Sequence, residues 1–224
     1  MLLHVPVVLK PDEVKLARSW LADARFVDGK LSAGLAARRV KANEELERGA
    51  ADVERLDRLV MGNLVRHPVY RAGALPLHAA SPLYARYRPG MVYGEHLDDP
   101  IMGTEGVMYR SDVAVTVFLS APEEYDGGEL VIRAAEGERV VKSAAGDAVL
   151  YPAGTIHHVN PVTRGERLVA LTWVQSLVRD PARRELLYGL NLAREKLLVA
   201  APEAQETAQV NAAYLNLIRM WSDI

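Results

Sequence analysis

Histidine and aspartate side chains at two distant places in the chain could together bind a metal ion. His96 and Asp98 stand in the stretch MVYGEHLDDP, at the end of a run of strand-forming residues. Residues two apart in a strand point to the same face, so these two could present an imidazole nitrogen and a carboxylate oxygen to one point. His157 lies much later, in YPAGTIHHVNP. Two histidines and one carboxylate form the facial triad that holds Fe(II) and leaves positions open for substrate and dioxygen.

The doublet His157 and His158 leaves the second histidine ligand to be chosen. Neighbouring residues on a strand face opposite sides, so only one of the two can join His96 and Asp98. The parity of the spacing to Arg167 favours His157, whereas a β-bulge would favour His158. The alternative without a metal is that His96 is a surface residue hydrogen-bonded to Asp98.

Arg167 lies ten residues after His157, in the alternating run RLVALTWVQS. The alternation points Arg167 the same way as apolar residues of that run, and an antiparallel partner strand is expected to bring it beside the His157 strand. A guanidinium among apolar neighbours needs an anion. A dicarboxylate co-substrate that chelates the metal at one end could supply it through a bidentate pair. The alternative is a salt bridge to Glu129 or Glu166.

The elements that must position these residues are strands between blocks of helix. Residues 83–176 break into short runs rich in Val, Ile, Thr and Tyr, separated by turn sequences such as RPG and YPAG. This pattern predicts a sandwich or barrel of antiparallel strands. Helices are predicted over 11–24, over about 44–66 with Asn43 as the N-cap, and again beyond Asp180. An apolar stripe on a terminal helix can also serve a dimer, so we expect a homodimer.

Composition limits both the ligands and the class of protein. The chain has 224 residues, half of them hydrophobic, enough for one large domain or a domain with an appendage. Its net charge is −2 with no block of like charge, which argues against binding nucleic acid. Cysteine is absent, so any metal must use His, Asp or Glu, and the composition fits a reducing compartment. No apolar run approaches the ~20 residues that span a bilayer, and no signal peptide is evident; we expect a cytoplasmic protein without membrane contact.

Several motifs in series resemble one protein family. The stretches YRPGMVYGEHLDDP, YDGGELVI, AGDAVLYPAGTIHHVNPVTRGER and WVQSLVRD resemble the bacterial PKHD-type hydroxylases, Fe(II)/2-oxoglutarate-dependent dioxygenases related to the prolyl and lysyl hydroxylases. The resemblance extends over essentially the whole chain. It implies that His96, Asp98 and His157 are the metal ligands and catalytic centre, and that Arg167 binds the C5 carboxylate of 2-oxoglutarate.

The resemblance also bears on two tyrosines. Tyr87, in ARYRPG, falls where related hydroxylases place a tyrosine that hydrogen-bonds the co-substrate, and Tyr93 is its rival. Either could instead be a barrel aromatic with its hydroxyl at the rim. The fold implied is α+β: a double-stranded β-helix, or jelly roll, over about 80–177, flanked by N-terminal helices and a C-terminal helical extension. The expected domains are 1–177 and 178–224.

The activity implied is hydroxylation of an unactivated C–H bond, coupled to decarboxylation of 2-oxoglutarate to succinate and CO2. The cofactors implied are Fe(2+), 2-oxoglutarate and O2, with L-ascorbate as a further candidate. The substrate, whether protein, peptide or small molecule, is not indicated. A cupin-like metal-binding isomerase or a non-catalytic ligand-binding jelly roll is the alternative, and Arg167 discriminates, because neither needs a buried arginine there. Residues 99–110, with Gly103 and Gly106, are expected to form a lid.

Overall fold

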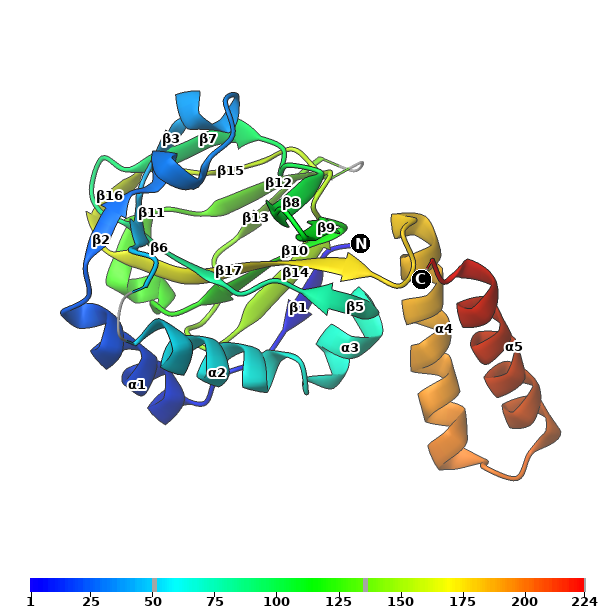
Figure 1. Cartoon of the computed structure of the whole chain (residues 1–224). Coiled ribbons are helices and arrows are strands. Elements are labelled where there is room, and N and C mark those ends of the chain that lie inside the picture. The colour runs from blue at the N-terminus through cyan, green and yellow to red at the C-terminus, as the bar shows by residue number, and fades with distance from the viewer. Residues whose placement is uncertain (50–51, 135–136, 224) are drawn as a thin grey trace.

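Two antiparallel sheets face each other in the computed structural model, which describes residues 1–49, 52–134 and 137–223 (Figure 1). In spatial order the larger sheet contains β1 (Leu3–Val5), β14 (Ala148–Pro152), β10 (Val113–Phe118), β17 (Arg167–Ser176), β6 (Leu83–Tyr87), β4 (Glu44–Leu46) and β2 (Phe26–Asp28), with β5 (Pro76–Ala79) also paired to β17. The second contains β13 (Gly137–Val141), β12 (Leu130–Ala134), β15 (His157–Val159), β7 (Val92–His96) and β3 (Lys41–Ala42). Two small sheets pair β11 (Tyr125–Gly127) with β16 (Val162–Gly165), and β8 (Ile101–Thr104) with β9 (Val107–Arg110).

The larger sheet is buried on both faces because its strands are apolar on both sides. In β10, Val115 and Val117 belong to a core shared with the helices, while Ala114 and Phe118 face the interior between the two sheets. The helices α1 (Pro11–Ala22), α2 (Val53–Leu64) and α3 (Pro68–Ala74) cover the outer face of this sheet (Figure 1). This packing closes one side of the sandwich and leaves its interior available for a site.

The C-terminal helices stand apart from these layers. The helices α4 (Pro181–Ala200) and α5 (Gln205–Trp221) run back along each other and project from the end of β17 (Figure 1). Asp180 begins α4, because its side chain accepts the backbone N–H groups of Ala182 and Arg183. Short 3₁₀ turns occupy η1 (Gly29–Ser32), η2 (Ala37–Arg39) and η3 (Pro122–Glu124).

The predicted α+β jelly-roll architecture is confirmed, and one helix prediction is wrong. Residues Glu44–Leu46 form β4 at the edge of the larger sheet, and the helix begins only at Val53. Asn43 is a buried residue and not an N-cap. Pairing with β2 and β6 overrides the local helical preference of this stretch. The domain boundary after residue 177, which falls between the end of β17 and the start of α4, stays a prediction.

Candidate metal and co-substrate site

The pairing of β7 with β15 brings two of the predicted ligands together. Their register sets His157 opposite His96, and the two ring centroids are 4.2 Å apart. Asp98 follows the end of β7, and its Oδ1 lies 3.8 Å from His157 Nε2. One possible ligand atom from each of the three side chains lies within 4.8 Å of the others. The fold therefore gathers the histidines and the carboxylate that the sequence suggests.

Backbone carbonyls fix the orientation of both imidazoles. His96 Nδ1 lies 2.8 Å from the carbonyl oxygen of Gly94, and His157 Nδ1 lies 2.8 Å from that of Thr155. A carbonyl oxygen can only accept, so each Nδ1 must carry the proton and donate it. Each Nε2 is then left with a lone pair. This tautomer is the one that suits a metal bound through Nε2.

Burial keeps His96 neutral and disfavours the ionised form of Asp98. It lowers the pKa of His96 to about 3, with a further contribution from the neighbouring His157. Burial raises the pKa of Asp98, partly opposed by His157. Asp98 Oδ2 has no hydrogen-bond partner among the described residues. A cation between these groups would relieve the desolvation of Asp98 without competing with a proton on His96.

The second member of the doublet faces elsewhere. His158 Nε2 lies 3.2 Å from the side-chain oxygen of Asn160, and His158 is not part of the three-residue group. Its neighbour His157 is buried, with 5% of its surface exposed. The strand alternation that separates the two side chains is therefore present in the structure.

Arg167 reaches the sandwich interior by a different route from the predicted one. It does not lie on a strand paired with the His157 strand, because β16 intervenes and the chain then crosses to the larger sheet as β17. There Arg167 pairs with Tyr87 of β6. Its guanidinium carbon lies 5.0 Å from the ring centre of Tyr87 and 5.8 Å from that of Phe118. The arginine thus approaches the candidate metal ligands His96, Asp98 and His157 from the opposite sheet.

The guanidinium has no anionic partner in the described structure. Arg167 is 1% exposed, and its Nε and Nη1 have no hydrogen-bond partner among the described residues. The salt-bridge alternative is wrong, because Glu166 pairs with Arg88 and Glu129 accepts from the amide of Asn160. A buried, unpaired guanidinium is costly, so its position indicates a place for an anion.

Gly128 allows the Arg167 side chain to lie where it does. This glycine has a φ of +66°, a conformation that side chains rarely adopt, and a Cβ there would lie 2.9 Å from Val162 Cγ2 and 3.1 Å from Arg167 Cδ. The ring of Tyr125 would also lie 3.1 Å from that Cβ. The hydroxyl of Tyr125 has no hydrogen-bond partner among the described residues. The second glycine of YDGGELVI therefore serves the site as well as the turn.

One cavity of about 370 Å³ is lined by His96, Asp98, His157 and Arg167. The two tyrosines that the sequence left as rivals lie at different places in it. Tyr87 is 1% exposed beside Arg167, and burial raises its pKa to about 12. Tyr93 stacks on the His96 ring, with centroids 3.6 Å apart and planes 10° from parallel. Tyr87 is therefore the one placed to share an anion with Arg167.

One wall of the cavity is polar, and the sequence did not predict it. Lys41, Asn43 and Glu45 are each at most 6% exposed, and Lys41 Nζ lies 2.5 Å from Glu45 Oε1 and 3.0 Å from Ser32 Oγ. Neither amide atom of Asn43 has a partner among the described residues. The signal available was the alternation of these three with the exposed Ala42. This signal does not predict a buried face, because polar residues pointing inward oppose the usual hydrophobic pattern of a strand.

Two family models match the chain. The model described as the 2OG-Fe(II) oxygenase superfamily matches residues 82–175, which include His96, Asp98, His157 and Arg167. The model described as the PKHD-type hydroxylase C-terminal domain matches residues 181–223, which cover α4 and α5.

Curated relatives match over the full length. A PKHD-type hydroxylase of Thioalkalivibrio sulfidiphilus is 49% identical over 224 residues, and one of Hyphomonas neptunium is 44% identical over 225 residues. In both comparisons the match covers 100% of each chain.

Solved structures share the fold at low identity. A prolyl hydroxylase of Trichoplax adhaerens, in complex with a hypoxia inducible factor peptide fragment, matches with a TM-score of 0.57 and 17% identity, covering 83% of this chain and 86% of that one. A Pseudomonas putida prolyl-4-hydroxylase matches with a TM-score of 0.50 and 22% identity, covering 78% and 92%.

Proposed function

Because the chain belongs to the PKHD-type hydroxylases, we propose that His96, Asp98 and His157 bind its Fe(II), and that Arg167 and Tyr87 bind the distal carboxylate of its 2-oxoglutarate. The protein is an Fe(II)- and 2-oxoglutarate-dependent dioxygenase. When bound, the iron and co-substrate supply the oxidation that hydroxylates a C–H bond, with release of succinate and CO2. The family relationship favours this activity over a cupin-like isomerase or binder.

The observation that carries the assignment is the unpaired Arg167 guanidinium in the same cavity as the histidine and aspartate group. A dicarboxylate bound between them would place one end at the metal and the other at the guanidinium. The two buried and unsatisfied charged groups would then both be compensated: the metal would neutralise Asp98, and the distal carboxylate would pair with Arg167.

The chain's own residues would hold and shield the reactants. The carbonyls of Gly94 and Thr155 keep both Nε2 atoms available, and Tyr93 packs flat against His96 to limit its rotation. Tyr87 is positioned to donate its hydroxyl hydrogen to a carboxylate beside Arg167, since burial keeps the hydroxyl protonated. The apolar residues between the two sheets would limit the access of water to this part of the cavity.

An anaerobic titration tests the assignment. Purified metal-free protein is titrated with Fe(II) and then with 2-oxoglutarate, and the weak visible charge-transfer band of the iron chelate is recorded. We expect the band with the native chain and with Asp99→Ala, whose aspartate is exposed next to the site, and its loss with Asp98→Ala. A band of full intensity in Asp98→Ala would refute the ligand assignment.

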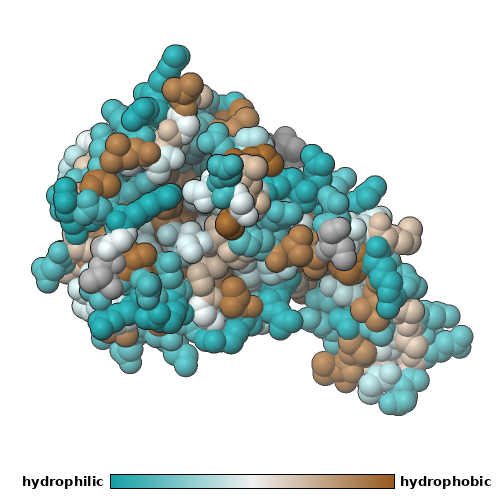
Figure 2. Space-filling view, viewed as in Figure 1, coloured by the Kyte–Doolittle hydropathy of each residue, from teal (hydrophilic) through white to brown (hydrophobic). Residues whose placement is uncertain are grey.

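The substrate, assembly and location are further proposals. The acceptor is an unidentified protein, peptide or small molecule, and no feature of the chain suggests nucleic acid. A homodimer through the C-terminal helices is supported by exposed apolar residues there, Leu186 at 65% and Val199 at 86%, and Figure 2 shows apolar colour on this part of the surface. Light scattering on the eluting protein would measure its mass.

A cytoplasmic location is supported by the absence of cysteine from the chain. None of the described helices combines the length and apolarity needed to cross a membrane. A role for L-ascorbate stays a prediction, and adding it to turnover assays would test it.

A further inference from the structure

A small hairpin lines the mouth of the cavity without joining either large sheet. Within the described parts of the chain, β8 and β9 pair only with each other, and Met102, Thr104 and Tyr109 of this hairpin line the cavity. Gly103 has a φ of +103°, and a Cβ there would lie 2.3 Å from the carbonyl oxygen of Val107, so the two strands are closely apposed. Since no sheet holds this hairpin, other contacts must set its position.

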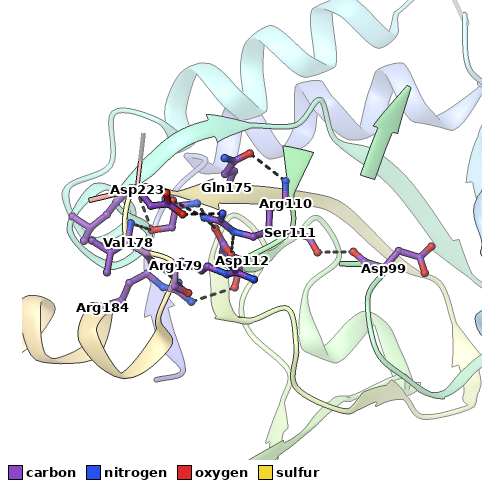
Figure 3. A network of polar contacts seen from close by, with 11 residues as sticks. Asp99, Arg110, Ser111, Asp112, Gln175, Val178, Arg179, Arg184 and Asp223 are labelled. Atoms are coloured by element: carbon purple, nitrogen blue, oxygen red, sulfur yellow. Dashed lines mark hydrogen bonds and ion pairs between the residues drawn. The ribbon is translucent and has the colours of Figure 1, made fainter. Parts of the chain in front are cut away.

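Arg110, at the end of β9, fixes the base of the hairpin. Its Nε donates to Asp112 Oδ1 at 2.7 Å and its Nη2 to Asp112 Oδ2 at 3.0 Å, which is a bidentate pair. Its backbone N–H donates to the side-chain oxygen of Gln175 on β17. The neighbouring Ser111 hydroxyl donates to the carbonyl of Asp99, at the other end of the hairpin (Figure 3). Arg110 and Ser111 therefore hold both ends of the segment.

Asp112 is also where the C-terminal helices attach. Its side chain is 5% exposed and accepts the backbone N–H of Ser176 at 2.8 Å. Its carbonyl oxygen accepts Nη2 of Arg184, a residue of α4 that is 3% exposed. Nη1 of Arg184 donates to the carbonyls of Val178 and Arg179, where the chain turns from β17 into α4 (Figure 3). One buried aspartate thus joins the hairpin, the jelly roll and α4.

The end of the chain returns to the same point. After α5, Asp223 Oδ2 lies 3.3 Å from Arg110 Nη1, and the Asp223 backbone N–H donates to the carbonyl of Leu177 at 2.7 Å. Trp221 packs against the apolar cluster around Val178. The guanidinium that anchors the cavity hairpin is therefore contacted from two sides, by the jelly roll through Asp112 and by the C-terminal extension through Asp223.

We propose that the C-terminal helical extension positions the β8–β9 hairpin over the cavity mouth, with Arg110 as the positioning residue and Asp223 as its contact from the extension. This role goes beyond the proposed function, which gives α4 and α5 a part in dimerisation and none at the cavity. It gives the extension a part in shaping the substrate entrance although it lies outside the jelly roll.

Amide hydrogen exchange on metal-free full-length protein tests the proposal. Asp223 is exposed, so Asp223→Asn should fold normally and remove one charged contact. We expect amides of residues 101–110 to exchange roughly two- to five-fold faster, as loss of a surface ion pair predicts. Asp223→Glu should restore slow exchange. Glu203→Gln, on the loop between α4 and α5, removes the same charge elsewhere and should change nothing in 101–110.

Arg110→Lys tests the other half of the contact. It keeps the charge and loses the two-donor fork to Asp112, so exchange in 101–110 should rise about ten-fold or more while β10 stays protected. Unchanged exchange in 101–110 for Asp223→Asn would overturn the proposal, whatever Arg110→Lys does, because Asp223 is the contact from the extension. So would an equal rise in β10, which would mean general destabilisation. The readout needs neither iron nor 2-oxoglutarate, so its failure is distinct from failure of the proposed function.

Discussion

Replacing Arg167 by methionine should weaken co-substrate binding and stabilise the empty protein. The two effects have one cause: in the structure the guanidinium is 1% exposed and two of its nitrogens have no partner among the described residues. Without a bound anion the buried charge destabilises the folded protein. With 2-oxoglutarate bound, the guanidinium is the principal contact of the distal carboxylate. Methionine fills a similar volume without the charge.

Both magnitudes follow from burial. Breaking a buried, hydrogen-bonded charge pair costs about 2 to 5 kcal/mol, so the dissociation constant of 2-oxoglutarate should rise roughly 30-fold or more. In the empty protein, each unsatisfied buried donor costs about 1 to 3 kcal/mol. Removing the guanidinium should therefore raise the melting temperature by about 2 to 4 °C for each kcal/mol recovered. Arg167→Lys should keep a charge, lose the planar fork, and bind 2-oxoglutarate less well than the native chain.

The assay measures both quantities on the same variants. Isothermal titration with 2-oxoglutarate in the presence of Fe(II), without oxygen, gives the affinity, and calorimetric melting of the metal-free protein gives the stability. Arg164→Met is the matched control, because Arg164 is an exposed arginine nearby that pairs with Asp126. It should leave co-substrate affinity unchanged.

The opposite pattern would refute the reasoning. If Arg167→Met lowers the melting temperature and leaves 2-oxoglutarate affinity at the native value, the guanidinium serves packing and not anion binding. The affinity for iron without co-substrate should hardly change in any of these variants, since Arg167 does not belong to the group formed by His96, Asp98 and His157.

Three further predictions concern the neighbouring residues. His157→Ala should abolish Fe(II) binding in equilibrium dialysis and His158→Ala should spare it, because only His157 belongs to the three-residue group; the reverse result would reassign the ligand. Gly128→Ala should lower the melting temperature and raise the 2-oxoglutarate dissociation constant together, since its Cβ would lie 3.1 Å from Arg167 Cδ; normal binding would show that the arginine can move aside. Tyr87→Phe should weaken the binding of 2-oxoglutarate by roughly three- to ten-fold, which corresponds to the loss of one hydrogen bond. Tyr93→Phe should keep the ring stacked on His96 and leave the affinity for 2-oxoglutarate unchanged. Equal effects of the two substitutions would refute the distinction between the two tyrosines.

The sequence determined the residue types of the candidate site. The residue types at 96, 98 and 157 are those of an iron triad, and the absence of cysteine limited the possible ligands to His, Asp and Glu. Strand alternation correctly placed Arg167 and Trp173 on one face, toward the cavity. These inferences are local, because the pattern within one strand decides which side chains share a face. The motif series also indicated the family that the full-length relatives show.

Only the tertiary structure decided which strands meet. His96 and His157 come together because β7 pairs with β15, and Arg167 enters from the opposite sheet, contrary to the expected neighbouring strand. Glu44–Leu46 became the short strand β4, where local propensity predicted the start of a helix, and Lys41, Asn43 and Glu45 are buried polar residues in this part of the chain. Strand pairing is a contact between residues distant in sequence, and its free energy depends on the partner strand and on burial between the sheets, neither of which a local pattern contains.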